Sequence, residues 1–302
     1  MVYPPLKLAT ALSRQGSAAH NEDAYVCEPE WGFYAVIDGA TSIVPYRVPE
    51  GMTGGWLAAQ VVALVLRQNA RQRALCSLPL NAVLALANDA LGQAMQDAVI
   101  DTTQPENLWS ACAAVVRLSD TYLEIAQIGD AVVEILYADG RAVLATPDQL
   151  ATVSETTRQK CIEARAAGCN SPSELMDFLR PHLVANRRLA NRPGGYGVLN
   201  GMPAAADFIF SQRLPLADIT GVLLMTDGLR TKGTVPFVRD GEDGLGVEQV
   251  IKHVRSMGLA GYTNWLLSLE QEDSTCLRYP RVKVSDDKTA IWLSRLNPHD
   301  EN

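Results

Sequence analysis

Histidine is scarce in this chain of 302 residues, and its cysteines are not paired in sequence. There are 4 histidines and 6 cysteines, and no two cysteines form a C-x-x-C motif. Zinc sites use histidine and cysteine at characteristic spacings, so a zinc centre is not expected. Scattered cysteines of this kind are better explained as buried free thiols than as disulfides, which indicates a reducing compartment.

The chain also lacks an excess of basic charge and any long apolar run. Lys and Arg total 26 against 34 for Asp and Glu, a net charge of −8, and no basic cluster stands out. This balance argues against a nucleic-acid-binding surface. The longest apolar stretches, such as residues 56–66, are too short to cross a bilayer, and no basic segment followed by an apolar core opens the chain. We therefore expect a cytoplasmic protein with neither a membrane nor a nucleic-acid partner.

Two short apolar segments each end at an aspartate that a glycine follows. Residues 33–37 have the composition of a buried strand and stop at Asp38, and residues 222–226 repeat the design before Asp227. A single Asp-Gly pair usually marks only a turn. Two such pairs after buried strands suggest two carboxylates delivered from neighbouring strands to one end of a sheet. Such a scaffold can hold a hard metal ion.

The rest of the chain mixes strand and helix patterns. Alternation and apolar runs predict strands at residues 7–13, 24–27, 33–37, 109–118, 122–128, 131–137, 207–212 and 222–226, and a last strand that ends near 293. Helical spacing predicts helices at 56–73, 80–98, 155–167, 172–189, 247–257 and 262–270. The three strands within 109–137 follow one another closely and predict a β-meander, in which the glycine and aspartate at 129 and 130 form a hairpin turn.

Acidic residues gather at the edges of the predicted strands. They are Glu22, Asp23, Asp38, Asp130, Asp227, Asp286 and Asp287. Oxygen ligands alone suit Mg²⁺ or Mn²⁺. Without cations, clustered carboxylates repel one another and raise each other's pKa. Two such ions roughly 3.5–4 Å apart, bridged by a carboxylate and a water, would form a site for in-line attack on phosphorus. Composition and spacing leave the reaction class open.

Five motifs in this order resemble those of the metal-dependent serine/threonine protein phosphatases of type 2C, in their bacterial form. The motifs are Asn21-Glu22-Asp23-Ala24, Phe33-Tyr34-Ala35-Val36-Ile37-Asp38-Gly39, Ile128-Gly129-Asp130, Leu224-Met225-Thr226-Asp227-Gly228 and Asp286-Asp287-Lys288-Thr289. The resemblance extends over about residues 8–294. It implies an α+β fold, a four-layer α-β-β-α sandwich of two antiparallel sheets flanked by helices. It also implies one domain over 1–296 with a variable flap at about 147–215, followed by a short polar tail, 297–302.

The resemblance assigns roles to the acidic residues. Asp38 would bridge two Mn²⁺ or Mg²⁺ ions, the Gly39 carbonyl would bind one of them, and Asp227 and Asp286 would complete one shell. Asp38 and Asp227 would thereby act in catalysis through a metal-activated water, the bridging hydroxide that attacks the phosphate.

Three further acidic positions receive supporting roles from the same resemblance. Glu22 would serve the other ion, directly or through water, with Asp23 behind it. Asp130 resembles the ligand of a weaker third ion. The implied partners are a phosphorylated protein substrate and a cognate serine/threonine kinase.

The chain departs from the family pattern at three positions. Ala18 stands where many members have an arginine that grips the substrate phosphate, and Arg14 is the nearby cation that could replace it. Ala40 stands where many members have a histidine, although bacterial-type members often lack it. Thr231 stands where some members have a further aspartate for the third ion.

These departures leave three functions to distinguish. The first is a Mn²⁺- or Mg²⁺-dependent phosphoprotein phosphatase that acts on phosphoserine or phosphothreonine. The second is a pseudophosphatase, a binding or regulatory module without turnover, which Ala18 and Thr231 would favour. The third is a metal-dependent phosphohydrolase of small molecules, because the sequence displays no peptide-binding groove.

Overall fold

Two five-stranded sheets form the centre of the protein. The computed structural model describes residues 6–44, 46, 51–72, 78–169, 171–230 and 250–295. In one sheet the strand order is β1 (Leu6–Arg14), β10 (Lys288–Arg295), β9 (Ile219–Met225), β6 (Val132–Tyr137) and β7 (Ala142–Leu144). In the other the order is β2 (Ala24–Glu28), β3 (Phe33–Gly39), β4 (Ala111–Leu118), β5 (Tyr122–Ile128) and β8 (Phe210–Pro215). Every pair of neighbouring strands is antiparallel.

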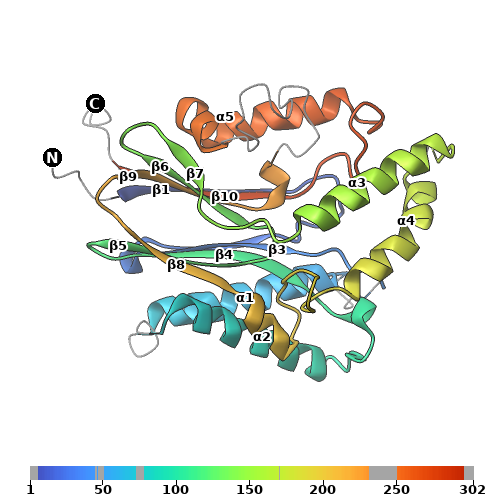
Figure 1. Ribbon diagram of the computed structural model, residues 1–302, viewed down its shortest axis with the longest axis horizontal. Coiled ribbons are helices and arrows are strands. Elements are labelled where there is room, and N and C mark those ends of the chain that lie inside the picture. Colours follow the sequence, from blue (N-terminus) through green and yellow to red (C-terminus); the bar gives the residue numbers. More distant parts are fainter. Residues whose placement is uncertain are drawn as a thin grey trace.

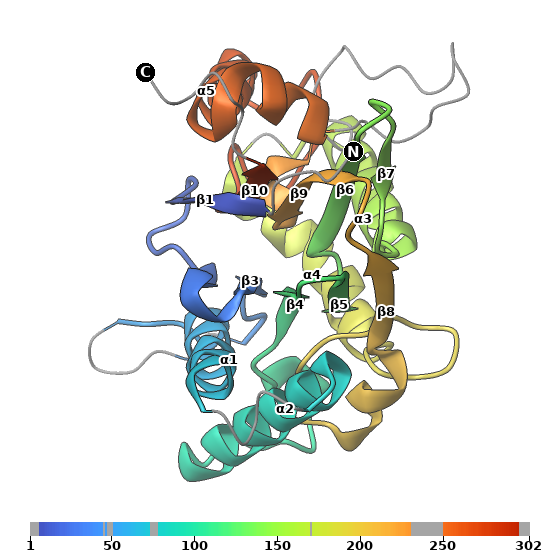
Figure 2. The ribbon, with the colours of Figure 1, turned by 90° about the vertical axis from the view of Figure 1, so that its left-hand side faces the viewer.

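Helices cover the outer faces of the two sheets. Helix α5 (Val250–Glu272) lies over the β1-β10-β9-β6-β7 sheet, and α1 (Gly54–Arg71) and α2 (Leu80–Asp97) lie over the other sheet (Figures 1 and 2). Helices α3 (Ala151–Ala166) and α4 (Pro172–Arg187) pair with each other and project from one end of the sandwich (Figure 1). The predicted four-layer α-β-β-α fold is confirmed.

Strand β3 shows why the chain folds into these layers. Side chains alternate across a strand, so Ala35 and Ile37 pack under the helices while Tyr34 and Val36 face the opposite sheet. Both faces are covered, and the strand therefore reads as a continuous apolar run. Burial of each large apolar side chain contributes roughly 1.5–3 kcal/mol. The strand leaves this core at Asp38, which places a carboxylate at one end of the sandwich.

The predicted β-meander is wrong at its second turn. Strands β4 and β5 pair, but β6 belongs to the other sheet, where it pairs with β7 and β9. The chain crosses between the sheets at Gly129, whose φ of +92° disfavours any residue with a side chain. A Cβ atom there would also overlap the Cys112 thiol. A crossing and a hairpin turn use the same residue types, so the sequence could not separate them. Asp130 follows this crossing and lies between the end of β5 and the start of β6.

Three other expectations differ from the structure. Asp38 and Asp227 do not follow neighbouring strands of one sheet, because β3 and β9 belong to the two facing sheets. The predicted strand at 207–212 begins late, since residues 203–208 form a 3-10 helix before β8. The two helices predicted near the end of the chain form α5, which breaks at Gly258 with φ 72° and ψ 161°.

The remaining predictions concern membrane-spanning helices and residues outside the described ranges. None of the helices in the described ranges is long and apolar enough to cross a membrane. The polar tail at 297–302 lies outside the described residues, as does the start of the helix predicted at 247–257.

Candidate functional site

Asp38 is the centre of a group of carboxylates at one end of the sandwich. Burial raises the pKa of the Asp38 carboxyl well above its ordinary value, and the nearby charges of Asp23, Asp227, Asp130 and Asp286 raise it further. Four of the predicted acidic residues are therefore close enough to Asp38 to act on it electrostatically. Asp38 still keeps partial solvent exposure, which an ion or a substrate needs in order to reach it.

Glu22 lies beside Gly39, the residue after Asp38, and is held by the start of helix α1. Its carboxylate accepts hydrogen bonds from the Thr41 hydroxyl at 2.8 Å and from the Thr53 hydroxyl. Thr53 is also the N-cap of α1 and accepts a hydrogen bond from the Trp56 amide. The Glu22 carbonyl accepts from the Gly39 amide at 3.2 Å. These contacts fix two of the predicted motifs against each other.

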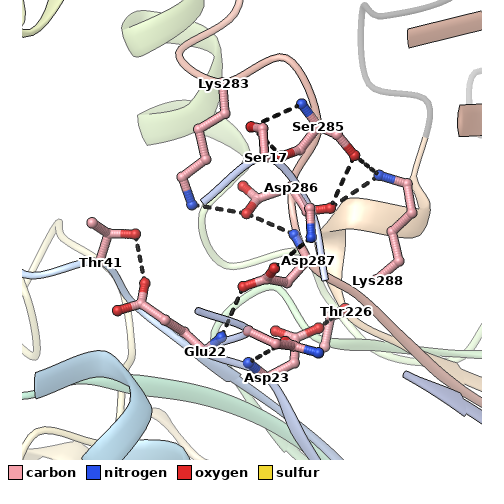
Figure 3. A network of polar contacts seen from close by, with 12 residues as sticks. Ser17, Glu22, Asp23, Thr41, Thr226, Lys283, Ser285, Asp286, Asp287 and Lys288 are labelled. Carbon is pink, nitrogen blue, oxygen red and sulfur yellow. Dashed lines mark hydrogen bonds and ion pairs between the residues drawn. The ribbon is translucent and has the colours of Figure 1, made fainter. Parts of the chain in front are cut away.

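Asp286 and Asp287 have different roles, although they are adjacent in sequence. Asp287 is buried and accepts hydrogen bonds from the backbone amides of Gly16 at 2.7 Å and Glu22 at 2.8 Å. Asp286 is 43% exposed and pairs with the Lys283 ammonium at 2.8 Å (Figure 3). Asp287 thus fastens the Glu22 loop, while Asp286 presents its carboxylate to the site.

Asp23 lies behind this group and is deeply buried. Its carboxylate accepts a hydrogen bond from the Thr226 hydroxyl at 2.9 Å (Figure 3). Burial raises the pKa of Asp23 well above its ordinary value, hydrogen bonds from Thr289 and Thr226 oppose this rise, and the charges of Asp287 and Asp286 add to it. Asp23 is thereby tied to Thr226, the residue that precedes Asp227.

Asp130 and Asp227 follow the ends of β5 and β9, one strand in each sheet. Asp130 is 6% exposed and follows the crossing at Gly129. Asp227 begins a short 3-10 turn after β9. The next residue, Gly228, lies so close to the Asp287 carbonyl that a Cβ atom would overlap it. The absence of a side chain at Gly228 therefore lets the Asp227 and Asp286 motifs approach each other.

Arg14 and Ala18, the residues discussed for the substrate phosphate, lie at the end of β1 and in the loop that follows it. Arg14 ends strand β1 opposite Lys288, and its side chain is exposed. Ala18 lies in the loop that follows, where its carbonyl accepts a hydrogen bond from Gln15. Thr231, discussed for the third ion, lies outside the described residues.

The donor set suits a hard divalent cation, although the side chains are not arranged as a finished chelate. Among residues with described positions, no three carboxylate, imidazole or thiolate groups converge as the ligands of one ion. Instead, the Glu22 carboxylate accepts hydrogen bonds from two hydroxyl groups, and the Asp286 carboxylate pairs with an ammonium group. The carboxylates around Asp38, whose charges raise its pKa, still form an all-oxygen set, which is what Mg²⁺ and Mn²⁺ require.

Sequence reasoning missed the residues that hold these carboxylates. Thr41 and Thr53 bind Glu22, and Lys283 binds Asp286. Arg187 of α4 donates to the Thr41 carbonyl at 2.9 Å, so the projecting helix pair touches the site loop. Only Lys283 had a local signal, a cation three residues before a candidate ligand. The other contacts join segments far apart in the chain.

The metal-free protein should lose stability as pH rises because of Asp38. Its folded pKa lies above the ordinary 3.8, so the folded state binds the proton more tightly than the unfolded state does. The stabilisation is complete below the unfolded value and disappears as pH rises through the folded value. Urea unfolding in EDTA should therefore show Asp38→Asn gaining stability relative to wild type from acid to neutral pH. A constant difference between the two proteins would contradict this.

The chain matches a known family over most of its length. The description of that family is Protein phosphatase 2C, and the match covers residues 12–257. Glu22, Asp38, Asp130 and Asp227 fall inside this range, and Asp286 follows it. A search of curated proteins finds no match.

Solved structures with the same fold come from several bacteria. The Mycobacterium tuberculosis serine/threonine phosphatase PstP/Ppp is 18% identical, with a TM-score of 0.54, over 96% of this chain and 99% of that one. PppA, a key regulatory component of T6SS in Pseudomonas aeruginosa, is 15% identical, with a TM-score of 0.55, over 97% and 99%. The PstP catalytic domain in complex with two manganese ions is 16% identical, with a TM-score of 0.54, over 96% and 98%. At these identities the likeness shows a shared fold.

Proposed function

Because the chain belongs to the protein phosphatase 2C family, whose members are metal-dependent serine/threonine protein phosphatases, we propose that it hydrolyses phosphoserine and phosphothreonine at the Asp38 site. The observation that carries this proposal is that carboxylates from both sheets lie close enough to Asp38 for their charges to raise its pKa. Such a group of negative charges needs compensating cations.

The proposed metal ligands are those that the family resemblance assigned. Asp38 would be shared by both ions, the Gly39 carbonyl would bind one of them, and Asp227 and Asp286 would complete the shell of one ion. Two Mn²⁺ or Mg²⁺ ions, when bound, supply a hydroxide near neutral pH and stabilise charge on the phosphoryl oxygens. The structure of PstP with two manganese ions supports this cofactor.

The other acidic residues complete the proposed site. Glu22 would serve the second ion and Asp130 a weaker third. The Thr41 and Thr53 hydroxyls orient the Glu22 carboxylate, and the Thr226 hydroxyl orients Asp23 behind it. These neighbours hold the carboxylates in place, which a metal site requires of the groups around its ligands.

The surroundings of the site suggest how substrate would be held. Helix α4 donates from Arg187 to the Thr41 carbonyl and from Arg180 to the Ile43 carbonyl, so the flap at about 147–215 borders the site loop. Arg14 at the end of β1 is the proposed phosphate-binding cation in place of Ala18. The proposed partners are phosphorylated proteins and a cognate serine/threonine kinase, in the cytoplasm, where free thiols persist.

A substrate panel with and without metal tests the proposed activity. Purified protein in Mn²⁺ should hydrolyse phosphothreonine and phosphoserine peptides faster than nucleotides or sugar phosphates, and EDTA should stop the reaction. Faster hydrolysis of the small molecules would indicate the phosphohydrolase alternative. Mn²⁺ binding without turnover of any substrate would indicate a pseudophosphatase.

A further inference from the structure

An ammonium group already lies among the carboxylates of the site. Lys283 Nζ is 2.8 Å from Asp286 Oδ1, and its side chain is 28% exposed (Figure 3). Burial lowers the pKa of this lysine, but the charge and hydrogen bond of Asp286, with the charges of Asp38 and Glu22, raise it overall. Lys283 therefore interacts with three of the proposed metal ligands at once.

The surrounding chain sets the position of Lys283. Two residues earlier, the Arg281 guanidinium binds the buried Asp273 carboxylate at 2.6 Å. The intervening Val282 packs against the small apolar core of the α3–α4 pair, which includes Leu175 and Leu179. A surface lysine with a nearby aspartate usually makes a weak and mobile pair. This lysine is instead anchored on its N-terminal side and directed into a group of negative charges.

The neighbouring lysine of the same motif provides a contrast. Lys288 is fully buried and donates to Glu270 at 3.0 Å and to the Asp286 carbonyl at 3.0 Å. Its charge is compensated by helix α5, so it supports the backbone of the motif. Lys283 is the lysine of this segment that binds the Asp286 carboxylate.

We propose that Lys283 is an internal cation that compensates the carboxylates of the metal-free site and competes with a divalent ion for Asp286. The inference rests on the proposed function, because it takes Asp286 as a metal ligand, and it adds a control on metal occupancy. A divalent ion and an ammonium repel each other, and both need the Asp286 carboxylate. The charge of Lys283 at Asp286 Oδ1 therefore opposes binding of the ion to the same carboxylate, which lowers the apparent affinity for metal.

Calorimetric titration of Mn²⁺ into EDTA-stripped, desalted protein tests this competition without measuring turnover. Lys283→Met keeps the length of the side chain and removes its charge. Loss of a hydrogen-bonded ion pair should tighten Mn²⁺ binding by about tenfold or more. The metal-free variant should also melt at a lower temperature than wild type, because the carboxylates are no longer compensated.

A matched control and a charge-preserving variant isolate the effect. Lys160 pairs with Glu163 three residues away at 2.6 Å on helix α3, so Lys160→Met removes a similar pair elsewhere and should leave Mn²⁺ affinity unchanged. Lys283→Arg keeps the charge and should bind Mn²⁺ much as wild type does. Lys283→Gln provides a second neutral variant if Lys283→Met does not fold.

The outcomes separate this inference from the proposed function. If wild type binds Mn²⁺ and the folded neutral variants bind it no more tightly, Lys283 does not compete with metal and this inference is overturned. If neither wild type nor the neutral variants bind Mn²⁺, the metal site itself is overturned. Binding by the neutral variants alone would show that Lys283 excludes the ion.

Discussion

Asp38→Asn is expected to abolish metal-dependent hydrolysis of a phosphothreonine peptide while the protein stays folded. Four other carboxylates lie close enough to Asp38 to act on it electrostatically. The substitution removes the charge of Asp38 with little change in the shape of the side chain. Loss of a partner that only orients a metal ligand typically costs about 10–100-fold. We expect a larger loss here, because Asp38 is proposed to contact both ions.

The control for Asp38→Asn is an aspartate outside the site. Asp139 lies in the turn between β6 and β7, where its exposed carboxylate accepts from the Arg141 amide. Asp139→Asn should retain wild-type kcat/KM. Initial rates in Mn²⁺, with circular dichroism to verify the fold, make the comparison. Substantial metal-dependent turnover in Asp38→Asn would place the chemistry at a different site.

Glu270→Ala is expected to destabilise the protein by about 3–5 kcal/mol, the usual cost of leaving a buried charge without its partner. Lys288 is completely buried, and Glu270 of α5 supplies its compensating charge. Because Lys288 also binds the Asp286 carbonyl and the Ser285 hydroxyl, the loop that carries Asp286 should loosen with it. Urea unfolding in EDTA measures the loss of stability.

Two comparisons test the interpretation of Glu270→Ala. Replacing both partners, as in Glu270→Leu with Lys288→Met, should recover most of the stability, because no buried charge remains. Glu163→Ala breaks an exposed ion pair with Lys160 and should cost less than about 1 kcal/mol. A loss in Glu270→Ala no greater than that in Glu163→Ala would show that Lys288 finds another partner.

Much of the fold could be predicted from local sequence, because each layer has its own periodicity. Strand β3 is apolar throughout since both of its faces are covered, and α1 and α2 have apolar residues at helical spacing. The ends of the apolar runs at 33–37 and 222–226 predicted that Asp38 and Asp227 lie where β3 and β9 end, as the structure has them. The assignment of strands to sheets failed at Gly129, because a turn sequence does not specify which strand the chain pairs with next.

The composition of the site could be predicted, but not its internal contacts. Acidic residues at strand ends identified the residues that gather near Asp38. The hydroxyls that hold Glu22 and the ammonium on Asp286 depend on loops meeting in three dimensions. Sequence periodicity does not encode such contacts. The sequence alone therefore could not show that Lys283 lies beside the carboxylates.

The most direct test of the account is a crystal structure of the protein grown with Mn²⁺, with data collected at the manganese absorption edge. The account predicts two anomalous peaks that share Asp38, one beside Asp227 and Asp286 and the other beside Glu22, with the Lys283 ammonium displaced from the Asp286 carboxylate. An occupied manganese site elsewhere, or no peak near Asp38 at millimolar Mn²⁺ with Lys283 still bound to Asp286, would contradict it.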